Sequence, residues 1–247
     1  MSETCAVLPV YEHGAPARAV VAGLRSLGLT CVLVDDGSGP ETARALDALS
    51  RSDPEVRLLR LPENSGKGAA VKAGLRLAAD RGFTHALQID ADGQHALEDV
   101  PRFLEASRAA PDAVICGLTR FGPETPRSRL HGRRITSFWT RIHTLSGDIP
   151  DPMCGFRIYP LAPALALMAD TQLGDRMDFD IEILVRLHWR RVPMRWIATA
   201  VRYPPGGISG FRMFFDNVLI TRVHTVLFFG MLARMPALLA RRRVPRG

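Results

Sequence analysis

The chain has 247 residues, of which 47% are hydrophobic and 23% charged, and its formal net charge is +7 at pH 7. This composition excludes a disordered chain and is typical of a soluble globular protein, and the length is enough for one generous domain with a sizeable core. The excess positive charge is mostly arginine and lies in the segment from Ile181 to Gly247, where Glu182 and Asp216 are the only acidic residues. A basic end attracts phosphates, nucleic acid or an anionic membrane surface. A GC-rich bacterial genome would give the same excess of arginine without any such role.

The first half of the chain alternates short apolar runs with segments of helical spacing. Strands are predicted at residues 5–10, 30–38, 55–64, 84–90 and 112–117, and helices at 16–27, 41–50, 66–81 and 97–109. Nearly apolar strands that alternate with helices indicate a parallel sheet covered on both faces. Ligands bind at the carboxyl ends of the strands in such sheets.

After Gly117 the pattern changes. Helices are predicted at about 130–145, 178–189 and 210–239, with a strand near 192–201 and breaks at the sequences DPMCGF and RYPPGG. The longest apolar stretch, 218–232, is interrupted by Arg222 and His224, and no stretch reaches the roughly 18–20 uninterrupted apolar residues of a spanning helix. We expect one domain over 1–207 and an amphipathic helical segment over 208–247.

The cysteines and the N-terminus point to a cytoplasmic protein. Cys5, Cys31, Cys116 and Cys154 are widely scattered without a CxxC pair, and the first three lie in apolar runs, where cysteine behaves as a small buried hydrophobe. No basic segment followed by a long apolar core, the mark of a signal peptide, begins the sequence. A reducing compartment is therefore the expected location.

Polar side chains follow four of the predicted strands and are expected to meet at one edge of the sheet. They are Tyr11 and Glu12, Asp35 and Asp36, Asn64, and Asp90 and Asp92. In the sequence IDADGQH, Asp90, Asp92 and Gln94 offer oxygen ligands at alternate positions. Such ligands select Mg²⁺ or Mn²⁺, and so few of them leave room for phosphate oxygens. The alternative is a solvated turn in which an aspartate caps the next helix.

Three similar motifs do not fit. An EF-hand loop needs a further acid and a glutamate at its twelfth position, where Gln94 and Pro101 stand. An aspartyl-phosphate phosphatase would carry its DxD on the first strand. A P-loop needs a glycine before the GK pair and a Ser or Thr after it, where Leu61 and Gly68 stand. What remains around Lys67 is a helix N-terminus suited to an anionic ligand, or a merely structural cap.

Five motifs together resemble a known family. VLPVYEHG, VDDGSG, ENSGKGAAVKAGL, IDADGQH and DPMCGFRIYP have the order and spacing of family 2 glycosyltransferases. Over about residues 5–200 the chain is similar to the branch that includes dolichyl-phosphate mannose and polyprenyl-phosphate sugar synthases. The C-terminal part resembles glycosyltransferase-like proteins of bacterial aryl-polyene or xanthomonadin pigment clusters. The resemblance implies the GT-A fold, a Rossmann-like α/β architecture with a mostly parallel central sheet and helices on both faces, followed by a C-terminal helical segment at a membrane interface.

The resemblance also assigns roles by position. It implies nucleotide-sugar binding by Pro9, Tyr11, Glu12, Asp36, Lys67 and Asp90. It implies that Asp90, Asp92 and Gln94 hold Mg²⁺ or Mn²⁺. The acceptor side would comprise Arg120, Arg133, Arg134, Ser137 and Arg157, although the stretch around Arg157 also fits an ordinary edge strand.

The segment GDRMDFDIEILVRL carries candidate bases. Many inverting members of the family have an aspartate at about this place that deprotonates the acceptor hydroxyl, and Asp178, then Asp180, are the candidates here. The alternative is a helix N-terminus with acids favoured by its dipole. A phosphate acceptor is already ionised at neutral pH and needs no base.

The expected function is metal-dependent inverting transfer of a sugar from a nucleoside diphosphate, such as UDP or GDP, to a polyprenyl phosphate or aryl-polyene-type lipid. The protein would lie on the cytoplasmic face of a bacterial plasma membrane and contact it through the C-terminal segment. A sugar-phosphate nucleotidylyltransferase would need a GxGTR-like loop after the first strand, which PVYEHGAPAR lacks. A non-catalytic accessory protein in a lipid or pigment assembly is the other alternative. A nucleic-acid binder explains the arginines but not the carboxylates, so no nucleic acid is expected.

Overall fold

The computed structural model describes residues 3–122, 127–201 and 213–242, and its centre is a seven-stranded sheet. The strands are β1 (Thr4–Val10), β2 (Cys31–Asp36), β3 (Val56–Leu61), β4 (His85–Gln88), β5 (Val114–Arg120), β6 (Arg157–Pro160) and β7 (Met194–Ala200). The helices are α1 (Gly14–Ser26), α2 (Pro40–Ser52), α3 (Lys67–Asp80), η1 (Leu97–Asp99), α4 (Val100–Ala109), α5 (Arg127–Thr144), α6 (Leu161–Asp170), α7 (Phe179–Trp189) and α8 (Met213–Arg242).

The sheet is mostly parallel, as predicted. The strand order is β3-β2-β1-β4-β6-β5-β7, and β6 alone runs antiparallel to its neighbours β4 and β5. The predicted strands and helices of the first half are all present. Helix α6 was not predicted, and a strand at β6 was only an alternative for the stretch around Arg157, because β6 has four residues and the mostly apolar α6 follows it directly.

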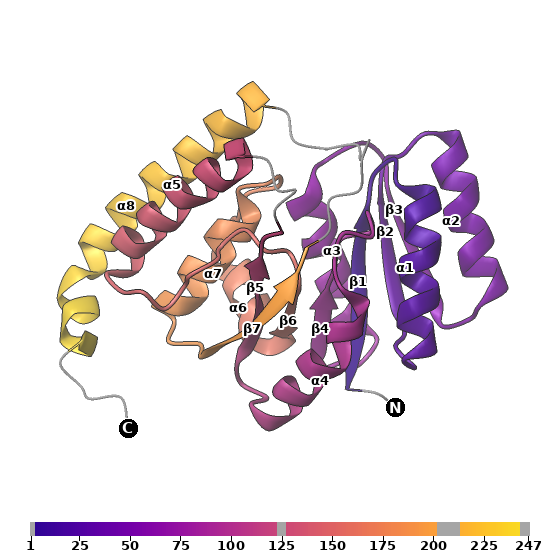
Figure 1. Ribbon diagram of the computed structural model, residues 1–247, viewed down its shortest axis with the longest axis horizontal. Helices are drawn as coiled ribbons and strands as arrows, with labels where there is room; N and C mark the ends of the chain where they lie inside the picture. The colour runs from indigo at the N-terminus through magenta and orange to yellow at the C-terminus, as the bar shows by residue number, and fades with distance from the viewer. Residues whose placement is uncertain (1–2, 123–126, 202–212, 243–247) are drawn as a thin grey trace.

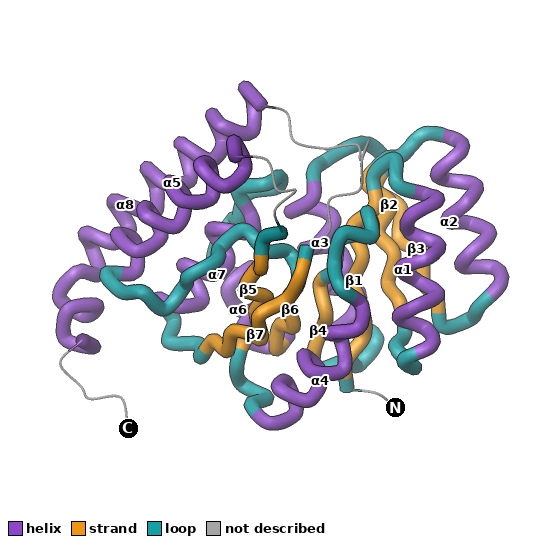
Figure 2. The backbone as a smooth tube through the Cα atoms, in the orientation of Figure 1, coloured by secondary structure: helices purple, strands orange, loops and turns teal. Residues whose placement is uncertain are grey.

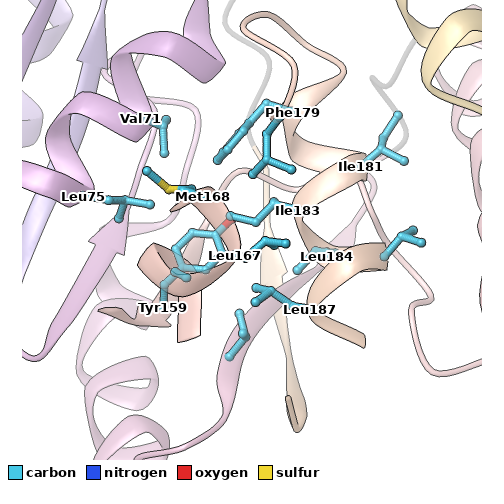
Figure 3. Close-up of a cluster of buried hydrophobic side chains, with 14 of the residues drawn as sticks. Val71, Leu75, Tyr159, Leu167, Met168, Phe179, Ile181, Ile183, Leu184 and Leu187 are labelled. Atoms are coloured by element: carbon cyan, nitrogen blue, oxygen red, sulfur yellow. The ribbon is translucent and has the colours of Figure 1, made fainter. Parts of the chain in front are cut away.

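Two buried clusters cover the faces of the sheet, which confirms helices on both sides. Side chains of α1, α2 and α4 pack on one face and those of α3, α6 and α7 on the other. Figure 3 shows the second cluster, where Phe179 and Ile183 of α7 meet Val71 of α3 and Tyr159 of β6. Cys5, Cys31 and Cys116 are buried and free, as predicted, and Cys154 is buried and free as well.

Helix α8 lies along α5 at one side of the molecule (Figure 1). One of its faces packs on the body through Val223, Leu227 and Met231, which are at most 5% exposed. The His143 and His224 rings share a 2.9 Å hydrogen bond between Nε2 and Nδ1 at the same interface. The predicted domain boundary after residue 207 lies outside the described residues.

Candidate functional site

The predicted polar residues, Asn64 included, lie at or just after the carboxyl ends of β1, β2, β3 and β4, four neighbouring parallel strands of the sheet. Their carboxyl ends therefore meet at one edge, where the connecting loops run (Figure 2). Strand β6 is antiparallel and pairs Arg157 with Gln88, so the start of β6 reaches the same edge. The sheet topology thus brings IDADGQH and DPMCGFR together, although 55 residues lie between them.

Asp90 lies in a cluster of charged groups just after β4. The ammonium group of Lys67 is 2.8 Å from Asp90 Oδ1, and His95 Nε2 is 3.6 Å from Asp90 Oδ2. Burial alone would raise the pKa of Asp90, but Lys67 and His95 hold it below its usual value. Asp90 is therefore a permanent anion at neutral pH.

Asp92 is the less neutralised of the two carboxylates. It accepts a 3.0 Å hydrogen bond from the backbone N–H of Gln94, and it forms no ion pair within the described ranges. Burial, then the charge of Asp90, raise its pKa. The carboxylates of Asp90 and Asp92 repel each other, and in the described part of the chain only Asp90 is paired with a cation. A bound metal ion would remove this repulsion, so the pair favours metal binding.

The donor set fits a divalent cation only as an open site. Among the described residues no three His, Cys, Asp or Glu side chains converge as they would in a closed metal site. Asp90, Asp92 and the half-buried Gln94 supply hard oxygen donors of the kind that Mg²⁺ and Mn²⁺ prefer. The remaining positions would be filled by the oxygens of a ligand.

The loop after β1 is tied to the start of α2. Glu12 has a left-handed backbone with φ of 55°, and its carboxylate accepts hydrogen bonds from the Gly39 N–H at 2.8 Å and the Thr42 hydroxyl at 3.3 Å. Tyr11 is 37% exposed and Pro9 is half-buried in β1. Of these three predicted residues, Tyr11 and Glu12 are both exposed and available to a ligand, whereas Pro9 is less so.

Asp36 is occupied by the backbone of the loop that precedes Lys67. Its two carboxylate oxygens accept 2.8 Å hydrogen bonds from the N–H groups of Ser65 and Gly66, and the residue is only 3% exposed. Burial raises its pKa despite these bonds. Gly66 has φ of 106°, and a side chain there would also strike the carbonyl oxygen of Asp175 at 2.5 Å. Asp36 thus holds the start of α3, and with it Lys67, against the site.

The two candidate bases lie in different surroundings. Asp178 precedes α7, accepts the N–H of Arg176 at 3.1 Å, and has a pKa raised by burial. Asp180 is 5% exposed and faces inward, where its carboxylate lies 3.0 Å from Lys67 Nζ and accepts a 3.1 Å hydrogen bond from the Gln88 amide. The two aspartates are both buried and differ in their partners: Asp180 is bound by Lys67 and Gln88, whereas Asp178 accepts a backbone N–H.

The predicted acceptor residues separate into two groups. Arg133 and Ser137, one turn apart on α5, face the loop before β6: Arg133 pairs with Asp151 at 2.6 Å and the Ser137 hydroxyl donates to the Pro150 carbonyl at 3.2 Å. Arg134, next to Arg133, is exposed, as is Arg120 at the end of β5.

Arg157 was predicted to contact the acceptor phosphate, and the structure places it elsewhere. Its guanidinium is fully buried and donates to the Pro152 carbonyl at 2.7 Å, the Tyr159 hydroxyl at 3.0 Å and the Asp180 carbonyl at 2.9 Å. The reason is that β6 is an interior strand of the sheet and not an edge strand. Two residues of this cluster, Gln88 and Tyr159, were not predicted; a polar Gln88 inside an apolar strand was the available signal.

Comparison with known proteins agrees with this arrangement. The model of the family described as "Glycosyl transferase family 2" matches residues 5–164, which include all five motifs in full. The chain belongs to this family. The match ends before α7, so the segment with Asp178 and Asp180 lies outside it.

Two of the similar proteins have a lipid phosphate in their names. An undecaprenyl-phosphate mannosyltransferase of Micrococcus luteus is 29% identical over 85% of this chain and 86% of its own length. A dolichyl-phosphate β-glucosyltransferase of Dictyostelium discoideum is 28% identical over 68% of this chain. The alignment spans only 53% of that relative, about half its length.

Solved structures show the same fold. Glucosyl-3-phosphoglycerate synthase of Mycobacterium tuberculosis, solved with Mn²⁺ and UDP-glucose, has a TM-score of 0.67 at 15% identity, covering 92% of this chain and 78% of its own. A mannosyltransferase of Pyrobaculum calidifontis, solved with GDP-Man and Mn²⁺, has a TM-score of 0.59 at 15% identity, covering 94% of this chain and 64% of its own. The predicted GT-A fold is confirmed.

Proposed function

We propose that the protein transfers a sugar from a nucleoside diphosphate to a lipid-linked acceptor, with polyprenyl phosphate as the leading candidate and an aryl-polyene-type lipid as the other. The observation that carries this proposal is the cluster of Asp90, Asp92 and Lys67 at the carboxyl ends of the central strands of a family 2 chain. The relatives named after undecaprenyl and dolichyl phosphate support a lipid phosphate as acceptor.

The geometry suggests how the donor is bound. Asp92 and Asp90, with Gln94, would hold Mg²⁺ or Mn²⁺, and the bound cation would neutralise charge on the departing diphosphate. Tyr11 and the Glu12 loop lie beside β1, where a base and ribose would rest, and Asp36 fixes the loop that carries Lys67. Transfer would be a direct in-line displacement with inversion.

The acceptor would approach from the side of α5. Arg133, steadied by Asp151, and the exposed Arg134 offer positive charge to a phosphate, and Ser137 lies one turn further along the helix. A phosphate nucleophile is already ionised. An acceptor hydroxyl would require a base, and of the two candidates Asp178 suits this role better because Asp180 is bound by Lys67 and Gln88.

We also propose that the protein lies on the inner face of a bacterial plasma membrane through α8. Its segment Phe215–Arg241 is long and apolar enough to cross a membrane, by length and composition only. One face of α8 is however packed on the body, and the opposite face exposes Phe229 at 64% and Val226 at 47%. A helix attached along its length favours contact in the plane of the surface over spanning.

Helix α5 extends this face. Its Phe138 is 60% and its Ile135 49% exposed. Neither α5 nor the chain after Asp216 contains an acidic residue, and Asp216 itself is 1% exposed. An apolar face with arginines and without carboxylates complements anionic lipid, and α5 would hold the acceptor arginines close to that surface.

A transfer assay tests the enzymatic proposal. The purified protein is incubated with Mn²⁺ or Mg²⁺, a panel of UDP-, GDP- and dTDP-sugars, and a polyprenyl phosphate or the matching polyprenol. We expect sugar in the lipid fraction with one donor class and with the phosphate. Donor binding without transfer to either lipid would support the accessory-protein alternative.

Vesicle flotation tests the membrane proposal. We expect the protein to float with vesicles that contain anionic phospholipid, and the double variant Phe138→Asp/Phe229→Asp to remain in the soluble fraction. Leu27→Asp, at a residue of similar character that is 40% exposed at the end of α1, is the matched control and should float. Equal flotation of both variants would contradict the assigned face.

A further inference from the structure

Lys67 is shared between two carboxylates that come from distant parts of the chain. Its Nζ lies 2.8 Å from Asp90 Oδ1 and 3.0 Å from Asp180 Oδ2, and its side chain is 14% exposed. Burial opposes the positive charge, but Asp180 and then Asp90 raise the pKa of Lys67 above its usual value. The lysine is thus a fixed cation between the carboxylate pair after β4 and the first turn of α7.

Asp180 is itself held in place from behind. The Gln88 amide donates to Asp180 Oδ1 at 3.1 Å, and Arg157 lies 3.5 Å from the same oxygen while donating to the Asp180 backbone carbonyl at 2.9 Å. Arg157 is fully buried, and Tyr159 and Pro152 fix its guanidinium. A buried carboxylate with these partners is held in one position.

The backbone passes so close to Lys67 at two glycines that a side chain would not fit at either. A side chain at Gly155 would place its Cβ 2.7 Å from Lys67 Nζ and 2.9 Å from an Asp90 oxygen. A side chain at Gly68, next to the lysine, would meet Phe179 at 2.5 Å. The DPMCGFR segment and the start of α7 are therefore packed directly on the pair formed by Lys67 and Asp90.

We propose that Asp180 is a positioning residue. It keeps Lys67 in the site when the Asp90 carboxylate binds the cation that accompanies the nucleotide sugar. This inference rests on the proposed function. Without Asp180, Asp90 would be the one carboxylate left of the two that pair with Lys67, and the lysine would compete with the cation for it. With Asp180 present, the lysine keeps a partner, and its charge stays beside the place of the leaving diphosphate.

This role replaces the predicted one for Asp180. A general base must reach a proton on the acceptor, whereas the oxygens of Asp180 are directed to Lys67, Gln88 and Arg157. Asp178, two residues earlier, has none of these three partners among the contacts of the described chain and gives a direct comparison.

The test is a double-mutant cycle on donor affinity. Metal-dependent binding of the nucleotide sugar is measured by isothermal titration for the wild type, Asp180→Asn, Lys67→Met and the double variant. We expect Asp180→Asn to weaken binding about tenfold, and the double variant to bind no more weakly than Lys67→Met alone, because Asp180 acts through Lys67. The KM for the acceptor should be unchanged in Asp180→Asn.

Controls separate this role from folding and from catalysis. Asp170→Asn removes a charge from a surface pair with Arg190 and should bind the donor like the wild type. Gln88→Met removes one donor to Asp180 and should cause a smaller loss in the same direction, which keeps the test available if Asp180→Asn does not fold. Additive losses, or normal donor binding with a lower kcat in Asp180→Asn, would overturn the proposal. A wild type that binds no donor would instead refute the proposed function.

Discussion

The histidine pair between α5 and α8 predicts how stability changes with pH. His143 is fully buried and His224 is 8% exposed, and Trp139 lies against both, with ring centroids 6.0 Å and 6.1 Å away. Burial lowers the pKa of each histidine from 6.5 to about 4, and for His143 the neighbouring His224 adds to the effect. Both rings are therefore neutral in the folded protein at neutral pH.

The sign of the effect follows from this depressed pKa. Below pH 6.5 the unfolded chain takes up protons at both positions, whereas the folded chain does not until about pH 4. The stability contributed by the pair is present above pH 6.5 and is lost as the pH falls towards 4. At pH 5 the loss is roughly 2 kcal/mol for one histidine and at most about twice that for both.

Urea unfolding at pH 8, 7, 6 and 5, followed by circular dichroism, measures this loss. The double variant His143→Leu/His224→Leu should show a flatter dependence of the free energy of unfolding on pH than the wild type. The remaining histidines are common to both proteins, so any contribution from them cancels in the comparison. Parallel curves for the two proteins would refute the reasoning.

Three further predictions concern the site. Gly155→Ala would push its Cβ to 2.7 Å from Lys67 Nζ, so we expect donor affinity measured by titration to fall about tenfold with little change in melting temperature. Asp151→Asn removes the partner of Arg133, and steady-state kinetics should show a higher KM for the lipid acceptor at unchanged donor KM. Asp178→Asn should lower kcat by about 10² or more with an acceptor hydroxyl and leave it nearly unchanged with an acceptor phosphate, as single-turnover rates would reveal.

Much of the fold follows from local patterns. Nearly apolar strands of four to seven residues alternate with amphipathic helices, so the parallel sheet and its crossing helices were predictable from periodicity. The position of Asp90 at the end of β4 followed from the same pattern, because an apolar run ends there in two carboxylates. The burial of Cys5, Cys31 and Cys116 followed from the apolar character of the segments around them.

The role of Arg157 could not be predicted in this way. Strand β6 is short, antiparallel and inserted between β4 and β5, and only that topology pairs Arg157 with Gln88. The surroundings of Asp180 likewise depend on α7, whose residues are almost all buried, so that acids in its first turn face the interior. Charged residues in an otherwise apolar helix were the available signal that buried partners exist.

The central claim is a metal-dependent nucleotide-sugar site at Asp90 and Asp92. Isothermal titration of the wild type and of Asp92→Ala with UDP-, GDP- and dTDP-sugars, with and without Mn²⁺, tests it most directly. We predict that the wild type binds one donor class only when Mn²⁺ is present and that Asp92→Ala does not bind it. Absence of metal-dependent binding to every donor, or unchanged binding by Asp92→Ala, would contradict the claim.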